Sequence, residues 1–284
     1  MRPRQWTKNL LVFMAPAAAG VLGDWHTTVR VLGALVVFCL VASGTYLVND
    51  AIDAGSDRYH PVKRRRPVAS GVLLPRTAVG TGASLIAVAI AAALFIGPWD
   101  FAVVVGSYAG LSIAYSLRLK HEPVVELAVV ASCFVLRAVA GGVVAHVPLS
   151  NWFLVFTSFA ALFVVTGKRA AEHARLGHDR GEHRQVLGEY TESFLKSTLI
   201  ISATVTVASY CLWAFERTGL LAHAGHEVVW IELTVIPLVL AVLHIFRLLD
   251  AGQGGEPEEL ALKDHILQVY GLLWFALMGI GLYA

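Results

Sequence analysis

The sequence predicts an all-α protein that crosses a membrane nine times. Its mean hydropathy is +0.66 and only 15% of its 284 residues are charged, which is typical of a polytopic membrane protein and not of a soluble enzyme. Apolar segments, most of them close to bilayer length, follow one another along the chain. The net charge of only +2 gives nucleic-acid binding no support.

The predicted spans form a single membrane domain over residues 1–284, because no soluble segment, low-complexity linker or clear internal repeat separates them. The first and sixth spans are short, and we expect them to be tilted, broken or partly interfacial. We expect the first to remain as a span and not to be a cleaved signal peptide. The predicted spans are 10–23, 31–48, 78–97, 101–117, 124–145, 152–166, 197–215, 229–246 and 266–283.

The basic residues predict how these spans are oriented. Of the 22 Lys and Arg residues, 19 fall on one set of alternate connections, Arg30 and Arg217 fall on the other set, and Arg137 lies within a span. Connections rich in Lys and Arg stay in the cytoplasm. We therefore expect the following segments on the cytoplasmic face: the N-terminus and the 49–77, 118–123 and 167–196 loops.

Three acids at the end of the second span predict a metal site. Asp50, Asp53 and Asp57 stand at i, i+3 and i+7, so on a helix they fall within an arc of about 60°. Carboxylates this close repel one another, and a segment bordered by lipid cannot relieve the repulsion cheaply. Mg²⁺ would relieve it, since Mg²⁺ binds one or two carboxylates and completes its shell with water and substrate phosphate oxygens.

A basic run, Lys63 to Arg66, follows the acids and predicts the other half of a diphosphate site. Lys and Arg side chains would hold the phosphate charge that the metal leaves unbalanced. The alternative is an acidic helix end beside a positive membrane anchor. No Ser–His–Asp set, Walker loop, Rossmann fingerprint or CxxC pair is present, so we expect displacement of diphosphate from carbon, run by carboxylates, metal and cations.

Two charged residues in the fifth span are costly in a membrane and are candidates for function. Glu126 opens the span and needs a wet cavity, a metal or a cation beside it. Arg137 follows three helical turns later on roughly the same face. It is either part of the site or one half of a structural ion pair with another helix.

The remaining polar clusters lie at expected cytoplasmic ends. The N-terminal cluster, with Gln5, Trp6 and Lys8, also fits a cationic interface with an aromatic belt. The 167–196 loop, with Lys168 and Arg169, is regularly charged and is expected to form helix on the membrane surface. Zinc is not expected there, because His173, His178 and His183 recur every five residues. Cys39, Cys133 and Cys211 are expected to be free, buried thiols.

Taken together, these residues resemble the UbiA superfamily of intramembrane prenyltransferases. Asn49-Asp50-x-x-Asp53-x-x-x-Asp57 matches its first aspartate-rich motif, and Lys63 to Pro67 matches the basic stretch that follows. The resemblance covers nearly the whole chain. It implies a nine-helix UbiA-type bundle with a site that faces the cytoplasm.

One departure narrows the resemblance. Most members carry a second aspartate-rich motif after the fourth span, whereas the matching loop here has Lys120 and Glu126. The chain instead resembles the branch that transfers phosphoribose to decaprenyl phosphate. The stretches that match this branch are Arg2-Pro3-Arg4-Gln5-Trp6-x-Lys8-Asn9, Leu119-Lys120-His121, Arg137-Ala138-x-Ala140-Gly141-Gly142, Gly167-Lys168-Arg169, Trp213-Ala214-Phe215-Glu216-Arg217 and Gly255-Glu256-Pro257-Glu258.

The resemblance implies a glycosyltransferase of the plasma membrane. Its donor would be 5-phosphoribose 1-diphosphate (PRPP), its acceptor a polyprenyl phosphate, and its product a phosphoribosyl lipid for arabinan synthesis in the cell wall. It also implies Mg²⁺ dependence and a homo-oligomer. The alternatives are a prenyltransferase that acts on an aromatic or other small acceptor, and a transporter or lipid-binding protein, although transporters place polar groups near the midplane.

The resemblance also suggests roles for individual residues. As catalytic residues we expect Asp50, Asp53, Asp57, Lys120 and Glu126, and as metal ligands the three Asp with Asn49. Glu126 would stabilise the ribosyl centre or bind a ribose hydroxyl. The expected substrate-binding residues are Gln5, Trp6, Lys8, Asn49, Arg58, Lys63, Arg64, Arg66, Tyr115, Arg137, Lys168 and Arg169, with Arg4 beside Lys8 at the lipid phosphate.

Overall fold

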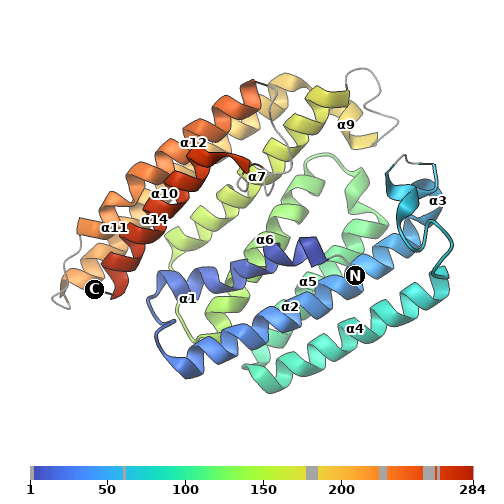
Figure 1. The fold of residues 1–284 in the computed structure, drawn as a ribbon, viewed down its shortest axis with the longest axis horizontal. Helices are drawn as coiled ribbons and strands as arrows, with labels where there is room; N and C mark the ends of the chain where they lie inside the picture. The colour runs from blue at the N-terminus through green and yellow to red at the C-terminus, as the bar shows by residue number, and fades with distance from the viewer. Residues whose placement is uncertain are drawn as a thin grey trace. The chain divides into compact units, whose positions relative to one another are not determined.

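The structure is a computed structural model, and it describes residues 3–59, 62–176, 185–223, 229–251, 260 and 263–283. Every regular element in these ranges is a helix, as predicted (Figure 1). Contacts divide the chain into two compact units, Met1–Leu149 and Ser150–Ala284, and each is described by itself. The single-domain organisation stays a prediction.

Eight helical segments of the described chain are long and apolar enough to cross a membrane, and they coincide with the last eight predicted spans. The sixth predicted span, 152–166, is longer than expected, because its helix extends to Leu176. The first predicted span, 10–23, instead holds a 3₁₀ helix η1 (Pro3–Phe13) and a short α1 (Met14–Ala18), so the nine-span count remains a prediction. The eight segments are α2 (Trp25–Ile52), α4 (Pro75–Ile96), α5 (Trp99–Leu117), α6 (Val125–Val144), α7 (Asn151–Leu176), α10 (Glu192–His223), α11 (Val229–Leu233) with α12 (Val235–Asp250), and α14 (His265–Tyr283).

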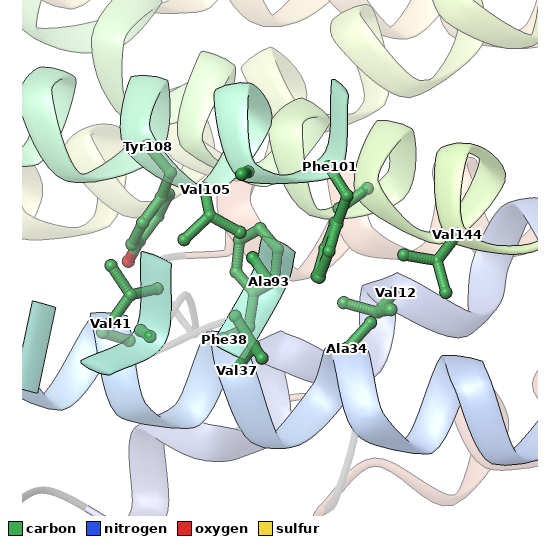
Figure 2. Close-up of a cluster of buried hydrophobic side chains, with 14 of the residues drawn as sticks. Val12, Ala34, Val37, Phe38, Val41, Ala93, Phe101, Val105, Tyr108 and Val144 are labelled. Carbon is green, nitrogen blue, oxygen red and sulfur yellow. The ribbon is translucent and has the colours of Figure 1, made fainter. Parts of the chain in front are cut away.

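Unit 1 is built on α2, which packs against η1, α4, α5 and α6. Asp24 caps the start of α2 by accepting a hydrogen bond from the backbone N–H of Thr27 at 2.8 Å. Inside the unit, fully buried side chains of α2 and α5 interdigitate (Figure 2), with Phe38 and Tyr108 in edge-to-face contact at 5.4 Å. This core fixes the far end of α2, where the acids lie.

Helices α2 and α4 lie side by side (Figure 1) and approach each other through two glycines. A Cβ on Gly44 would lie 2.7 Å from the carbonyl oxygen of Gly82, and a Cβ on Gly82 would lie 2.8 Å from that of Gly44. Only glycine permits this distance between backbones. The contact sets where α4 begins relative to the end of α2.

Unit 2 consists of α7, α9 (Gln185–Glu189), α10, α11, α12 and α14. Its largest helix pair is α7 with α10, and Phe163, Leu199 and Val242 form a buried cluster with Ala203. The hydroxyl of Tyr210 accepts a hydrogen bond from Trp274 Nε1 at 2.7 Å and lies 2.6 Å from Thr234 Oγ1. This buried network joins α10, α14 and the break between α11 and α12.

Candidate active site

The aspartate-rich segment keeps helical hydrogen bonding although α2 ends at Ile52. The backbone N–H of Asp53 donates to the carbonyl of Asn49, and that of Asp57 donates to the carbonyl of Asp53, both at 2.9 Å. Helical hydrogen bonds therefore cross the break between α2 and the short helix α3 (Ala54–Asp57). Asp50 and Asp57 are buried and Asp53 is half-buried.

Two cations divide the three carboxylates between them. One guanidinium nitrogen of Arg66 lies 2.5 Å from Asp57 Oδ2 and 3.3 Å from Asp50 Oδ1. Lys120 donates to Asp53 Oδ1, and the amide of Asn49 donates to Asp53 Oδ2 at 3.1 Å. The structure therefore brings Asn49, the acids, Arg66 and Lys120 together at one end of unit 1.

The segment that carries Arg66 is anchored by small apolar contacts. Val68 is buried against Ala54 and Ala78, which belong to α3 and α4. Gly71 has φ +83°, a left-handed conformation that favours glycine, and it turns the chain back toward α4. These contacts hold the basic run over the acids. Lys63 is half-buried, while Arg58, Arg64 and Arg65 are exposed at its margin.

Lys120 reaches the site from the connection between α5 and α6, in the short 3₁₀ turn η3 (Leu119–His121). The connection ends in a classic γ-turn: Val124 has φ +64°, and the N–H of Val125 donates to the carbonyl of Pro123 at 2.6 Å. Such a turn is rare and strained for a β-branched residue. Helix α6 (Val125–Val144) begins directly after this turn, and its first turn contains Glu126, which is fully buried.

A cavity of about 210 Å³ adjoins the acids through Asn49. Among the residues that the structure describes, its lining contains two cations, Lys8 and Arg137, and no carboxylate side chain. The other lining residues come from α2, α5 and α6: Thr45, Tyr46, Asn49, Tyr108, Ser112, Tyr115, Ser116, Val129, Val130, Cys133 and Phe134. This charge pattern suits an anionic group.

Arg137 is buried within this unit and is only 3% exposed. Its Nε donates to Asn9 Oδ1 at 2.9 Å, and its two terminal nitrogens donate to the Tyr108 hydroxyl at 2.9 Å and to the Cys133 carbonyl at 2.5 Å. Among the described residues its partners thus include no acid. The expected alternative of an ion pair with another helix is replaced by a hydrogen-bonded network.

The N-terminal candidates lie on η1. Trp6 donates from Nε1 to the Ser43 hydroxyl at 3.3 Å, Lys8 Nζ lies 5.8 Å from the centre of the Phe134 ring, and Gln5 is half-buried. The side chain of Arg4 lies outside the described residues. So do His60, His178, His183 and the 255–258 stretch.

The candidates of the 167–196 loop belong to unit 2, where α7 extends to Leu176. Lys168 is half-buried, and Arg169 is 4% exposed and bonded to Glu172 at 2.8 Å. His173 Nε2 lies 2.9 Å from the carbonyl oxygen of Tyr190. Residues 167–176 continue the apolar helix α7, so this part of the predicted loop is not a separate helix on the membrane surface.

The donor chemistry at the acids fits Mg²⁺, which prefers carboxylate and amide oxygens. Asp50 and Asp57 already share one positive group, so a cation at that point would be held by both. As the described residues stand, no group of three or more His, Cys, Asp or Glu side chains could hold a metal. The three carboxylates are already paired with Arg66 and Lys120, so binding of one Mg²⁺ by all three acids would require these cations to leave them.

Sequence reasoning missed the inner wall of the cavity. Tyr46, Tyr108, Ser112 and Phe134 line it, yet each lies in an apolar span where an aromatic or a single hydroxyl is ordinary. The signal that could have found them is spacing, since Tyr108, Ser112 and Tyr115 follow at i, i+4 and i+7 on one helix face. The three cysteines are free, as expected, but half-buried.

Comparison with known proteins adds a family and a fold. The model of the UbiA prenyltransferase family matches residues 10–280. Over its full length the chain is 42% identical to the decaprenyl-phosphate phosphoribosyltransferase of Mycolicibacterium smegmatis, covering 91% of that protein. It is also 42% identical over 98% of its length to the protein of that name from Mycobacterium tuberculosis, of which it covers 91%. A UbiA homologue from Archaeoglobus fulgidus, solved with GPP and Mg²⁺, has a TM-score of 0.71 at 18% identity, covering 99% of this chain and 95% of that one.

Proposed function

The chain belongs to the UbiA prenyltransferase family, and we propose that it transfers the 5-phosphoribosyl group of PRPP to decaprenyl phosphate or a similar polyprenyl phosphate. The observation that carries this proposal is full-length 42% identity to proteins named for that reaction. The site supports it, because acids, cations and an acid-free cavity meet at one end of unit 1. These parts suit a substrate with several phosphate groups.

The donor's diphosphate is assigned to the acids and the basic run. Asp50, Asp53 and Asp57, with Asn49, would hold Mg²⁺, which when bound neutralises charge on the diphosphate. Lys63, Arg64 and Arg66 would bind phosphate oxygens, with Arg58 and Tyr115 at the margins of the site. Lys120 would leave Asp53 for the donor. Lys168 and Arg169 of unit 2 stay predicted phosphate ligands, to be tested by substitution.

The acceptor needs no strong general base, because a lipid phosphate is already anionic at neutral pH. One of its oxygens attacks the anomeric carbon of the donor, and the bond from that carbon to the diphosphate oxygen breaks with inversion. Lys8 would bind the lipid phosphate, and Gln5 and Trp6 would frame it. Glu126 would stabilise the cationic ribosyl centre or bind a ribose hydroxyl. Catalysis is then positioning plus electrostatic stabilisation.

The proposal includes the setting of the enzyme. The bias of basic residues supports nine spans with the site on the cytoplasmic face of the plasma membrane. The polyprenyl tail would lie along apolar helix surfaces, and the product would feed arabinan synthesis in the cell wall. We also propose a homo-oligomer, which cross-linking in native membranes would test.

A donor-choice assay tests the function. Purified protein in detergent would be offered PRPP with decaprenyl phosphate, or geranyl diphosphate with an aromatic acceptor, and released pyrophosphate would be measured. We expect release only with the first pair. Release only with the second pair would establish the conventional prenyltransferase instead.

A further inference from the structure

The helix η1 is unusual because it is a 3₁₀ helix of 11 residues, whereas such helices rarely exceed three or four. Residues three apart in a 3₁₀ helix are eclipsed, so Trp6, Asn9 and Val12 share one face. That face is held by α2 and α6: Trp6 donates to Ser43, the Asn9 amide donates to Cys39 Sγ at 3.3 Å, and Val12 is fully buried. Its conformation is therefore set by its neighbours.

The contacts between η1 and α6 match in spacing. Asn9 Oδ1 accepts a hydrogen bond from Arg137. The backbones of Val12 and Gly141 approach so closely that a Cβ added to Gly141 would lie 1.7 Å from the carbonyl oxygen of Val12. Three residues of a 3₁₀ helix rise about 6 Å, and four residues of an α-helix also rise about 6 Å. The 3₁₀ conformation thus lets Asn9 meet Arg137 and Val12 meet Gly141 in one register.

This register places Lys8, the neighbour of Asn9, against α6. The Phe134 ring is near two cations, with Lys8 Nζ at 5.8 Å from its centre and Arg137 Cζ at 5.7 Å. All three nitrogens of Arg137 are bonded to protein groups, which come from η1, α5 and α6 itself. A guanidinium held in this way fixes the positions of the groups that it bonds.

We propose that Arg137 is a positioning residue for the acceptor: through Asn9 and Phe134 it sets Lys8 in the cavity, where Lys8 binds the phosphate of the lipid. The inference rests on the proposed function, which assigns Lys8 to that phosphate. It gives the intramembrane arginine a role in substrate selection in place of direct contact with the reacting atoms.

Four variants test the inference in steady-state kinetics with both substrates varied: Lys8→Ala, Arg137→Gln, the double variant and Asn9→Ala. Each single change should raise the KM for polyprenyl phosphate about tenfold, the effect of roughly 1.4 kcal/mol, and leave the KM for PRPP within about twofold. The double variant should be no worse than Lys8→Ala, because Arg137 acts through Lys8. Arg30→Gln, on the exposed start of α2, is the matched control and should change neither value.

Multiplied effects in the double variant would overturn the inference and make Arg137 a direct phosphate ligand. Equal rises in both KM values together with a lower melting temperature would overturn it in favour of a purely structural role. Asn9→Ala keeps the charge and removes the link, so it decides the matter if Arg137→Gln does not fold. Failure of the unsubstituted protein to transfer phosphoribose at all would instead refute the proposed function, and the inference with it.

Discussion

At the scale of single residues, the site is an arrangement of three negative and two positive groups that hold one another. Arg66 forms ion pairs with Asp50 and Asp57, and Lys120 forms an ion pair with Asp53. Removing one partner of a buried pair leaves the other uncompensated. Under the proposed function, the same cations would turn to phosphate oxygens when the substrate binds.

Replacing Asp50 or Asp53 by Asn should lower turnover by about 100-fold or more, because the metal and diphosphate lose a charged ligand. Folding should be preserved, since Asn keeps the shape and can still accept hydrogen bonds. Asp100→Asn, at the exposed start of α5, is the matched control. Turnover measured at saturating substrates decides this, and undiminished activity in either variant would remove the metal-site assignment.

Lys120→Ala should raise the KM for PRPP about 10- to 100-fold and change the KM for the lipid little, because charge-assisted bonds to phosphate contribute roughly 1.5–3 kcal/mol. Lys196→Ala, an exposed lysine of α10, serves as the control. A larger rise in the KM for the lipid would move Lys120 to the acceptor site.

At this scale the sequence identifies candidate residues but not the partners that they bond. The acids and the basic run are candidates by residue type and spacing, and Lys120 is a candidate through the resemblance. The bond between Lys120 and Asp53 joins residues 67 apart, and only the packing of α5 and α6 against α2 brings them together. The strained turn at Val124 was likewise unpredictable, because β-branched residues rarely adopt a positive φ.

At the scale of elements, close approach of helices determines where the site's parts meet. Gly82→Ala would place a Cβ 2.8 Å from the Gly44 carbonyl oxygen and should destabilise the protein by about 1–3 kcal/mol. Gly80→Ala, on the same helix with nothing within 4 Å of its Cβ, should be neutral or stabilising. Thermal unfolding in detergent measures both, and equal melting temperatures would contradict the account of the α2–α4 contact.

The N-cap of α2 should make stability depend on pH. The backbone N–H and hydroxyl of Thr27 lower the pKa of Asp24 below its usual 3.8. A carboxylate with a lowered folded pKa stabilises above the unfolded value, and that contribution is lost as the pH falls through the folded value. Asp24→Ala should therefore melt lower than wild type at pH 7, with a gap that narrows below pH 3.8. Asp24→Ser keeps a cap without titrating, so a pH-dependent gap between it and Asp24→Ala would contradict this.

The long apolar helices were predicted as elements, and the first span was expected to be short and to be tilted, broken or partly interfacial. Eight spans were readable because their length and hydropathy suffice. The 10–23 segment is apolar too, yet it is divided between η1 and α1. The contacts of η1 with Arg137 and Gly141 join residues more than a hundred positions apart, so the local sequence does not indicate them.

At the scale of the whole molecule, the chain pairs a membrane scaffold with a polar site at one end of unit 1. The fold is shared with a solved UbiA homologue at 18% identity, whereas the 42% identity to proteins named decaprenyl-phosphate phosphoribosyltransferase supports the proposed donor. The proposed function therefore requires PRPP, and not a prenyl diphosphate, as the donor.

The most direct test follows isotope from ribose-labelled PRPP into lipid. Purified protein in detergent would receive the labelled donor and decaprenyl phosphate, with Mg²⁺ or with EDTA, and the lipid would be extracted into organic solvent. We predict label in the lipid phase with Mg²⁺ and none with EDTA. No label in the lipid phase under either condition, alongside turnover of a prenyl diphosphate, would contradict the account.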